Sequence, residues 1–249
     1  MRRQQLHSFQ TTIFIYRIIP MQLLKYLQAQ GIGSRKSCQW LIENDCVEIN
    51  GQIENHPKQE IQPQEVHTLT IDGEPHIVVP LPYFYILLNK PADYETSHKP
   101  SDYPSIFSLL PDQLRNLDLQ AIGRLDADTT GVILITNDGQ FNHRMTSPKH
   151  KVDKLYQACL KHPADESLCQ TLMAGVLLHD DNETVAATAA ELSNPTTLLL
   201  TLREGKYHQV KRMVAAAGNR VEQLHRLRFG SWDEDDLAIG EWKFIYPNE

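Results

Sequence analysis

Long apolar segments, paired cysteines and metal-binding motifs are all missing from this chain of 249 residues. No window approaches the roughly eighteen uncharged apolar residues that a membrane-spanning helix needs. The four cysteines form no CxxC pair, which argues against a disulfide framework and a zinc site. The eleven histidines show neither HExxH nor HxxxH spacing. We therefore expect a cytoplasmic protein with reduced thiols, no bound metal and no membrane partner.

Acidic residues outnumber basic ones, and the net charge of −7 disfavours a polyanionic partner. Hydrophobic residues make up 41% and charged residues 22%, as in ordinary globular proteins. The charge is unevenly distributed, however. From Arg203 to Arg228 there are seven basic and two acidic residues, and four acidic residues follow at 233–236. A local basic face binds phosphates even on an acidic molecule, so nucleic acid remains a candidate partner.

The first twenty residues differ in character from the rest of the chain. They contain Arg2, Arg3 and Arg17 without any acidic residue, and Arg17 interrupts their short apolar stretch. A weak targeting segment is one interpretation. We favour a translation start at Met21 or a poorly ordered extension over residues 1–20.

Residues 21–71 are expected to form a small αβ module. Leucines at helical spacing predict a first helix, and Ser34 is suited to cap a second one. The alternating stretch 47–53 meets an Asn-Gly turn, which is a signal for a β-hairpin. Arg35 and Lys36 stand at the start of the second helix, where they are expected to be exposed and able to contact phosphate.

The segment 72–82 is predicted to be a linker because it contains a glycine and three prolines. A larger domain is expected over residues 83–249. In it, strand-like runs alternate with helical segments, which indicates an α+β fold with a substantial sheet. The predicted strands are 84–88, 132–136, 156–161, 197–202 and 221–227.

Residues 123–131 place an arginine and two carboxylates between glycines, directly before a buried strand. A loop at the edge of a sheet presents its side chains from a rigid support. Arg124 can bind phosphate while Asp126 or Asp128 does chemistry. A polar turn in which an aspartate caps backbone N–H groups explains the spacing equally well.

A second polar segment, 204–218, predicts a helix. Its buried stripe consists of Val210, Met213, Val214 and Ala217, and a glycine ends it. The polar residues near its start are His208, Lys211 and Arg212. They form either a solvated basic face or an anion site, since a helix N-terminus attracts anions.

Four stretches of the chain together resemble one enzyme family. They are 123–131 (GRLDADTTG), 137–150 (NDGQFNHRMTSPKH), 154–156 (KLY) and 205–213 (GKYHQVKRM). The chain is similar to the RsuA-type pseudouridine synthases, which modify ribosomal small-subunit RNA. The resemblance runs from Met21 to the C-terminus. It implies an S4-like RNA-binding module followed by a synthase domain, whose mixed, mainly antiparallel sheet is flanked by helices.

The same resemblance implies roles for individual residues. Asp126 corresponds to the catalytic aspartate, which either attacks C1′ of the uridine or removes a 2′ proton. Tyr156 corresponds to the tyrosine that stacks on the uracil, and Lys211 to the basic residue that pairs with the aspartate. Arg124 corresponds to the arginine that fills the space of the flipped nucleotide. Asp128 is interpreted as ordering the turn that follows it, and no cofactor is needed.

The implied partner is 16S ribosomal RNA or a small-subunit assembly intermediate, bound by a monomer. Phosphate contacts are expected from basic residues of both domains. In the S4-like module, Gln22-Leu23-Leu24 replaces the usual Arg-Leu-Asp and Asp45-Cys46-Val47 replaces Gly-Arg-Val, which weakens its RNA-facing charge. The expected RNA-binding residues are Arg35, Lys36, Arg124, Lys206, His208, Arg212, Arg226 and Arg228.

Three other functions are alternatives to this one. A large-subunit ribosomal RNA pseudouridine synthase of the same superfamily is an alternative. A non-catalytic S4-type RNA-binding protein is disfavoured by the intact set of Asp126, Tyr156 and Lys211. A two-carboxylate hydrolase is disfavoured because Asp126 and Asp128 lie too close in sequence to flank a sugar from opposite faces.

Overall fold

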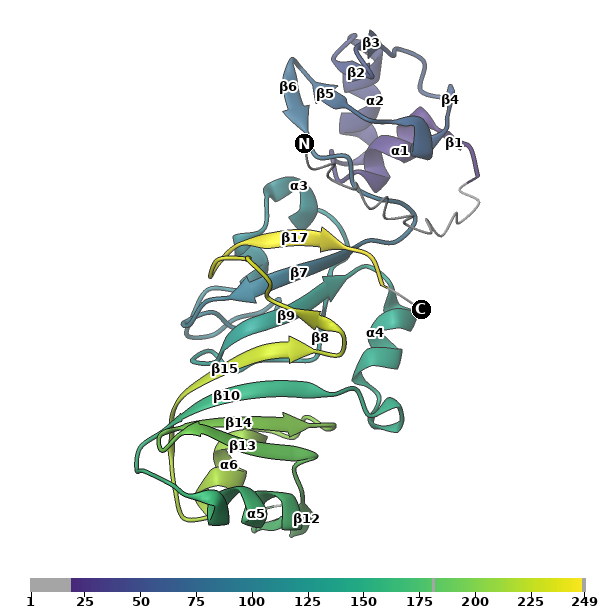
Figure 1. Ribbon diagram of the computed structural model, residues 1–249. Helices are drawn as coiled ribbons and strands as arrows, with labels where there is room; N and C mark the ends of the chain where they lie inside the picture. Colours follow the sequence, from purple (N-terminus) through teal and green to yellow (C-terminus); the bar gives the residue numbers. More distant parts are fainter. Residues whose placement is uncertain (1–18, 181, 248–249) are drawn as a thin grey trace, which may run out of the picture. The chain divides into compact units, whose positions relative to one another are not determined.

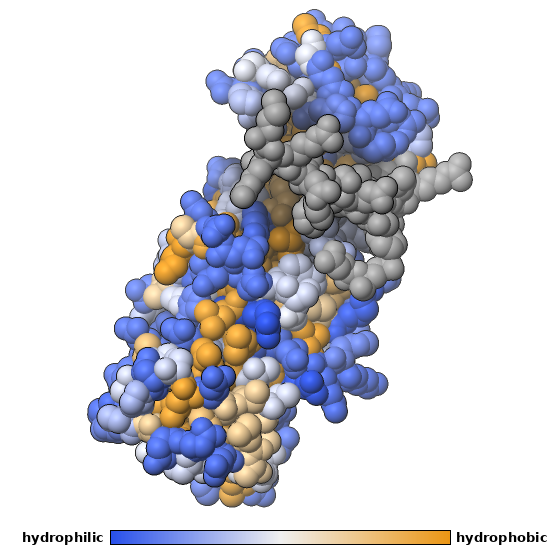
Figure 2. Space-filling model, viewed as in Figure 1, coloured by the Kyte–Doolittle hydropathy of each residue, from blue (hydrophilic) through white to orange (hydrophobic). Residues whose placement is uncertain are grey.

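The computed structural model describes residues 19–180 and 182–247 (Figure 1). The chain divides into two compact units, one ending at Pro82 and the other beginning at Tyr83. The expectation for residues 1–20 therefore falls almost wholly outside the described ranges. Within those ranges, no helix is long and apolar enough to cross a membrane. Figure 2 shows that polar side chains dominate the visible face, with apolar side chains in separate patches.

The first unit consists of two short helices and small antiparallel sheets. The Ser34 hydroxyl accepts a hydrogen bond from the Ser37 N–H at 3.2 Å, which caps the second helix as predicted. Asn50 and Gly51 both have positive φ, as the turn of a two-residue hairpin requires. The elements are α1 (Leu23–Ala29), α2 (Arg35–Glu43), β1 (Met21–Gln22) paired with β4 (Glu60–Ile61), the four-stranded sheet of β3 (Gln52–Ile53), β2 (Val47–Ile49), β5 (Leu69–Ile71) and β6 (Glu74–His76), and a 3₁₀ turn, η1 (Pro63–Glu65).

Residues 72–82 are structured within this first unit. β6 pairs with β5, and further along Val79 is buried. The buried side chain of Gln30 donates to the Val79 carbonyl at 3.0 Å and accepts from the Val79 N–H at 2.6 Å. These two hydrogen bonds tie the segment to the end of α1.

A nine-stranded mixed sheet forms the centre of the second unit as described. Its strands run in the order β13-β14-β10-β15-β9-β7-β17, with β16 beside β15 and β8 beside β9. All neighbouring strands are antiparallel except β15 and β9. The strands are β7 (Tyr85–Lys90), β8 (Gln120–Ile122), β9 (Thr130–Thr136), β10 (Lys154–Leu160), β13 (Ala189–Asn194), β14 (Thr197–Leu202), β15 (Val221–Phe229), β16 (Trp232–Asp233) and β17 (Trp242–Ile245). This confirms the predicted α+β class and the five predicted strands.

Short helices flank this sheet, and α5 and α6 lie at the end that carries β13 and β14 (Figure 1). α5 packs on β13, α6 on β11 and β15, and α4 on β8. The remaining elements are η2 (Ile106–Leu109), α3 (Asp112–Arg115), α4 (Gly139–Thr146), η3 (Pro148–His150), α5 (Glu166–Ala174), β11 (Val176–Leu178), β12 (Glu183–Val185) and α6 (Gln209–Ala216).

The parallel contact between β9 and β15 sets the position of the loop before β9. In this contact Thr130 lies opposite His225, and Gly131 lies opposite Arg226. Gly131 has φ +104°, and a Cβ atom at this position would lie 2.3 Å from the Arg226 carbonyl oxygen. Only glycine allows the two strands to approach so closely. The loop 123–129 is therefore held at the place where β9 and β15 meet.

Helix α6 begins later than the sequence predicts. Residues 204–208 form a loop, and the helix runs from Gln209 to Ala216. The buried Gln209 side chain accepts a hydrogen bond from the Lys206 N–H and donates one to the Glu204 carboxylate, both at 2.8 Å. These bonds hold the chain in a loop ahead of the helix. Val210, Met213 and Val214 are buried as predicted, whereas Ala217 lies after the last helical residue.

Candidate active site

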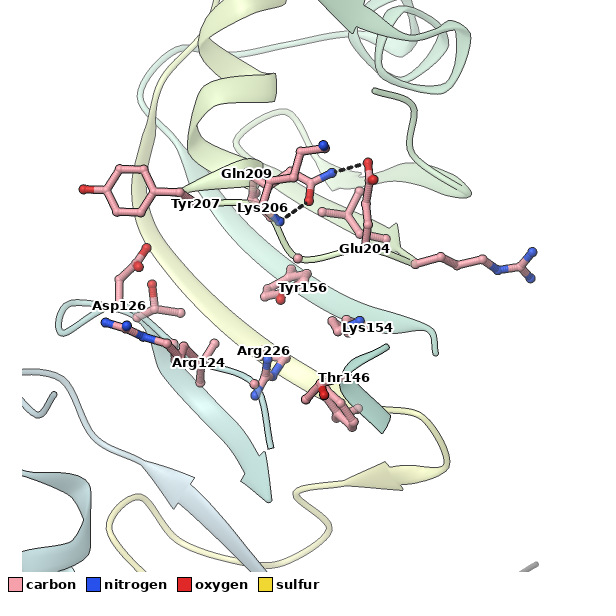
Figure 3. Close-up of a pocket in the computed structure, with 18 of the residues that line it drawn as sticks. Arg124, Asp126, Thr146, Lys154, Tyr156, Glu204, Lys206, Tyr207, Gln209 and Arg226 are labelled. Atoms are coloured by element: carbon pink, nitrogen blue, oxygen red, sulfur yellow. Dashed lines mark hydrogen bonds between the residues drawn. The ribbon is translucent and has the colours of Figure 1, made fainter. Parts of the chain in front are cut away.

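A cavity of about 570 Å³ lies between the two segments singled out in the sequence (Figure 3). The loop before β9 lines one side and the loop before α6 lines another. Tyr156 and Lys154 enter from β10, and Arg226 enters from β15. Figure 3 shows Asp126 near the loop before α6, with Tyr156 between it and Lys154. A cavity of this size can take a nucleotide-sized ligand.

Asp126 stands at this cavity beside two nitrogen atoms of the loop and helix opposite. Its Oδ1 lies 3.4 Å from His208 Nε2, and its Oδ2 lies 3.7 Å from Lys211 Nζ. Its side chain is about one-third exposed, at 32%. The Thr129 N–H donates to the Asp126 carbonyl at 3.1 Å, which closes a tight turn behind the carboxylate. The carboxylate is thus accessible from the cavity while its backbone is fixed.

The closest partner of Lys211 is Asp128, not Asp126. Lys211 Nζ donates to both carboxylate oxygens of Asp128, at 2.7 and 2.8 Å. Asp128 was interpreted as ordering its own turn. Its contact with the Thr129 hydroxyl is longer, at 3.5 Å. Partial burial acts to raise the pKa of Asp128, but the hydrogen bond and charge of Lys211 outweigh it, and the pKa is lowered. Asp128 therefore holds Lys211 in place beside Asp126.

Lys90, at the end of β7, forms hydrogen bonds with the loop that precedes β9. Its ammonium group is fully buried and donates to the carbonyls of Pro91, Ala127 and Thr129 at 2.9, 3.0 and 2.8 Å. Burial lowers the pKa of Lys90 to about 8, although the charges of Asp128 and Asp126 act to raise it. No sequence motif named above includes this residue. The available signal was a lysine at the end of an apolar strand, directly before a proline.

Tyr156 is 8% exposed and lies opposite Arg226 across the β10–β15 pair. Its ring contributes an aromatic wall to the cavity. Lys154, two residues earlier on the same face of β10, donates to the Val152 carbonyl at 3.0 Å. Burial, with the positive charge of Arg226, lowers the pKa of Lys154. This part of the cavity is therefore aromatic, partly buried and positively charged.

The side chain of Arg226 is buried, whereas a contact with a phosphate on the RNA surface needs an exposed side chain. Its side chain is 1% exposed, its Nε donates to the Val132 carbonyl at 2.7 Å, and its guanidinium lies 5.0 Å from the centre of the Phe229 ring. A buried guanidinium bonded to a strand carbonyl can contact only RNA that enters the cavity, so the RNA contact predicted for Arg226 stays a prediction, restricted to that part of a substrate. Arg226 also links β15 to β9 and forms part of the cavity wall.

The other predicted RNA-binding residues are distributed over several surfaces. Arg124 is exposed and lines the cavity. The partly buried side chains of His208 and Lys206 line it too. Lys206 Nζ pairs with Glu183, and Arg212 Nε lies 3.5 Å from an Asp180 oxygen. Arg228 is exposed on β15, and the exposed Arg35 and Lys36 belong to the first unit. The structure thus brings three of these residues to the cavity besides Arg226.

No group of three or more histidine, cysteine, aspartate or glutamate side chains that could hold a metal ion occurs among the described residues. The groups nearest the Asp126 carboxylate are the imidazole of His208 and the ammonium group of Lys211. The site thus offers a carboxylate beside a lysine and a histidine at the edge of a partly aromatic cavity. Such an arrangement suits a nucleophile or base acting on a ribose.

Residues 84–216 match the family model described as RNA pseudouridylate synthase. This range includes Asp126, Tyr156 and Lys211. The chain belongs to the RNA pseudouridylate synthase family. It is accordingly a pseudouridine synthase, as its sequence motifs predicted.

Relatives of this family match almost the whole chain. The ribosomal small subunit pseudouridine synthase A of Escherichia coli (strain K12) is 38% identical over 230 residues, which cover 92% of this chain and 98% of that protein. The protein of the same name from Pasteurella multocida (strain Pm70) is 35% identical and matches 92% of this chain and 97% of its own length. A solved structure described as a pseudouridylate synthase is 33% identical, with a TM-score of 0.63 over 91% of this chain and 96% of that one.

Proposed function

We propose that this enzyme converts a specific uridine of 16S ribosomal RNA into pseudouridine, with Asp126 as the catalytic carboxylate. The observation that carries the proposal is the position of Asp126, at the edge of the cavity between His208 and Lys211, near the ring of Tyr156. The small-subunit substrate is supported by the names of the relatives that match over their whole length. The large-subunit alternative has no such support among them.

The reaction is an isomerisation in which every atom of the uridine is kept. The bond between N1 and C1′ breaks, the uracil turns, and a bond between C5 and C1′ forms, while the C5 proton leaves and N1 gains one. Asp126 acts either by attacking C1′ or by removing the 2′ proton to give a glycal-like intermediate. Both routes use the carboxylate of Asp126, and Lys211 Nζ lies 3.7 Å from its Oδ2.

The cavity walls supply the remaining functions. Tyr156 stacks on the flipped uracil and takes part in proton transfer at C5. Moving a base out of its stack costs a few kcal/mol of free energy, and stacking on an aromatic side chain offsets part of that cost. Lys211 holds Asp126 oriented, while Arg124 occupies the space that the flipped uridine leaves. No cofactor takes part, since the detached uracil is its own acceptor.

We further propose that the first unit contains an S4-like RNA-binding domain over residues 21–71, and that the linker 72–82, which packs on this domain through β6 and Val79, leads to a catalytic domain at 83–249. Exposed Arg35 and Lys36 at the start of α2 would contact phosphates. The protein would act as a monomer in the cytoplasm, on 16S RNA or on a small-subunit assembly intermediate.

Mapping pseudouridine in RNA tests the proposal. The protein is incubated with an unmodified 16S transcript, with a partly assembled small subunit, and with a 23S transcript, and pseudouridine is located by carbodiimide-stop primer extension. One new stop in 16S RNA is expected. A stop only in 23S RNA supports the large-subunit alternative, and no stop in any RNA contradicts the proposal.

Two variants assign the catalytic carboxylate. Asp126→Asn removes the charge without changing the shape, and we expect the rate to fall at least about 100-fold. Asp118→Asn is the matched control, because Asp118 is an exposed carboxylate outside the cavity. Full activity of Asp126→Asn would reject Asp126 as the catalytic residue even if the enzyme modifies 16S RNA.

A further inference from the structure

Tyr207 is an exposed aromatic residue at the edge of the cavity. Its side chain is 75% exposed, yet it lies among the residues that line the cavity. Figure 3 shows its ring beside Asp126 and directed away from Tyr156. Tyr156, at 8% exposure, is therefore an aromatic ring within the cavity wall, and Tyr207 is an aromatic ring at the cavity entrance.

The Tyr207 ring is already stacked on one side. It lies against the His208 imidazole, with ring centres 3.8 Å apart and planes 19° from parallel. The same imidazole places its Nε2 3.4 Å from Asp126 Oδ1. Single exposed aromatic residues are common and need no explanation. A two-ring stack that reaches the carboxylate at the cavity is a more specific arrangement.

The backbone under this stack is held in an uncommon conformation. His208 has φ +47°, in the left-handed region that residues other than glycine rarely adopt. Its neighbours hold it there. Arg212 Nη1 donates to the Tyr207 carbonyl at 3.2 Å, and Gln209 accepts from the Lys206 N–H at 2.8 Å. The two rings thus project from a fixed loop, and the strain at His208 is maintained by contacts on both sides of it.

We propose that Tyr207 and His208 form a stacking platform for a nucleobase next to the target uridine. This inference rests on the proposed function, since it assumes that the uridine enters the cavity. When that uridine turns into the cavity, an adjacent base loses a stacking neighbour. The free face of Tyr207 at the entrance replaces that neighbour. Stacking on an aromatic ring accepts any base, so the platform contributes affinity and positioning rather than sequence recognition.

Substitutions of Tyr207 separate stacking from hydrogen bonding. The substrate is a short RNA around the uridine mapped in wild-type protein. We expect Tyr207→Ser to raise Kd and KM roughly 5- to 100-fold, because base–aromatic stacking has this magnitude. The effect on kcat should be smaller, since the platform contacts RNA before and during the reaction alike. Tyr207→Phe and Tyr207→Trp should recover most of the lost affinity. Tyr246→Ser is the control, at 73% exposure and outside the cavity.

Abasic RNA identifies the stacked base. Removing the base on one side of the target uridine should weaken binding by wild-type protein and have little further effect on Tyr207→Ser. The platform is overturned if Tyr207→Ser binds RNA as tightly as Tyr246→Ser does. It is overturned as well if each flanking abasic site weakens binding by wild-type protein and by Tyr207→Ser to the same extent. It is also overturned if Tyr207→Phe is as weak as Tyr207→Ser. Failure of the proposed function is distinct, because wild-type protein would then produce no pseudouridine at all.

Discussion

Lys211 donates to both carboxylate oxygens of Asp128, at 2.7 and 2.8 Å, while it stands 3.7 Å from the nearer oxygen of Asp126. One lysine thus lies between two carboxylates, and the carboxylate we propose as catalytic is the less tightly held. Asp128 therefore takes the short contacts with Lys211, and Asp126 keeps a longer one.

Two substitutions test whether Asp128 positions Lys211 beside Asp126. Asp128→Asn removes the two short hydrogen bonds that Lys211 donates to a carboxylate, so we expect kcat to fall about 3- to 30-fold because Lys211 is less firmly held. Lys211→Met removes the cation itself, and the fall in kcat should be larger. Adding Asp128→Asn to Lys211→Met should then have little further effect. Single-turnover rates of the two single variants and the double variant test this, and fully additive losses would contradict it.

The variants His208→Gly and His208→Ala distinguish the effect of losing the imidazole ring from the effect of backbone strain at this position. Both variants lose the imidazole beside Asp126, and we expect kcat to fall about 10- to 100-fold in each, because the carboxylate is less well positioned. Glycine adopts positive φ without cost, so His208→Gly should be more stable than His208→Ala by about 1 kcal/mol. Urea unfolding and single-turnover rates provide the comparison. Equal stability would mean that φ +47° carries no strain.

Lys90 should titrate far below other lysines. Burial lowers its pKa to about 8, whereas the unfolded value is about 10.4. The unfolded chain then binds more protons between these values, so stability rises with pH through this window, by about 3 kcal/mol in total. Below pH 8 both states are protonated, and the cost of burying the charge is present in full. NMR of ¹³Cε-labelled lysine should show one group with a midpoint near 8.

Lys90→Met provides the matched measurement. It removes the titrating group and leaves the carbonyls of Pro91, Ala127 and Thr129 without their shared donor. The difference in unfolding free energy between wild type and Lys90→Met should therefore change between pH 8 and 10, while contributions from other groups cancel. A constant difference across this range would show that Lys90 titrates normally.

Gly131→Ala should disrupt the contact between β9 and β15. The added Cβ would lie 2.3 Å from the Arg226 carbonyl oxygen, at a φ of +104°. We expect a loss of stability of about 3 kcal/mol or more, because neither strand can shift without breaking the sheet. Gly139→Ala is the control, since no atom lies within 4 Å of its added Cβ and its φ is not positive. That substitution, at the start of α4, should be neutral or slightly stabilising. Thermal unfolding of both variants makes the comparison, and similar midpoints would contradict the argument.

The sequence predicted the parts of the fold that depend on local pattern. The apolar runs 132–136 and 197–202 became β9 and β14, and the stripe at Val210, Met213 and Val214 became the buried face of α6. Local pattern sufficed there because a continuous apolar run marks a strand buried on both faces, such as β9, and helical spacing marks the single buried face of α6. The start of α6 was predicted wrongly, since side-chain bonds of Gln209 to Lys206 and Glu204 decide it.

The site was predictable in its residue types but not in its pairings. Two aspartates two positions apart give no sign of which one a distant lysine will bind, and Lys211 binds Asp128 most closely. The burial of Lys90 and Arg226 was not predicted, for another reason. Charged side chains are usually exposed, and both of these are buried through bonds to carbonyls supplied by other strands and loops. Such bonds exist only once the sheet has formed.

From the parallel contact of β9 with β15 we expect the cavity to form late in folding. Asp126 precedes one of these strands, and Arg226 lies on the other, with β10 and α6 between them in the sequence. Closing so long a loop has an entropic cost that local hairpins avoid, so contacts of this kind form after them. A chain with only its hairpins formed has no cavity and no triad of Asp126, Asp128 and Lys211. The enzyme therefore becomes able to modify RNA only when its last strands are paired.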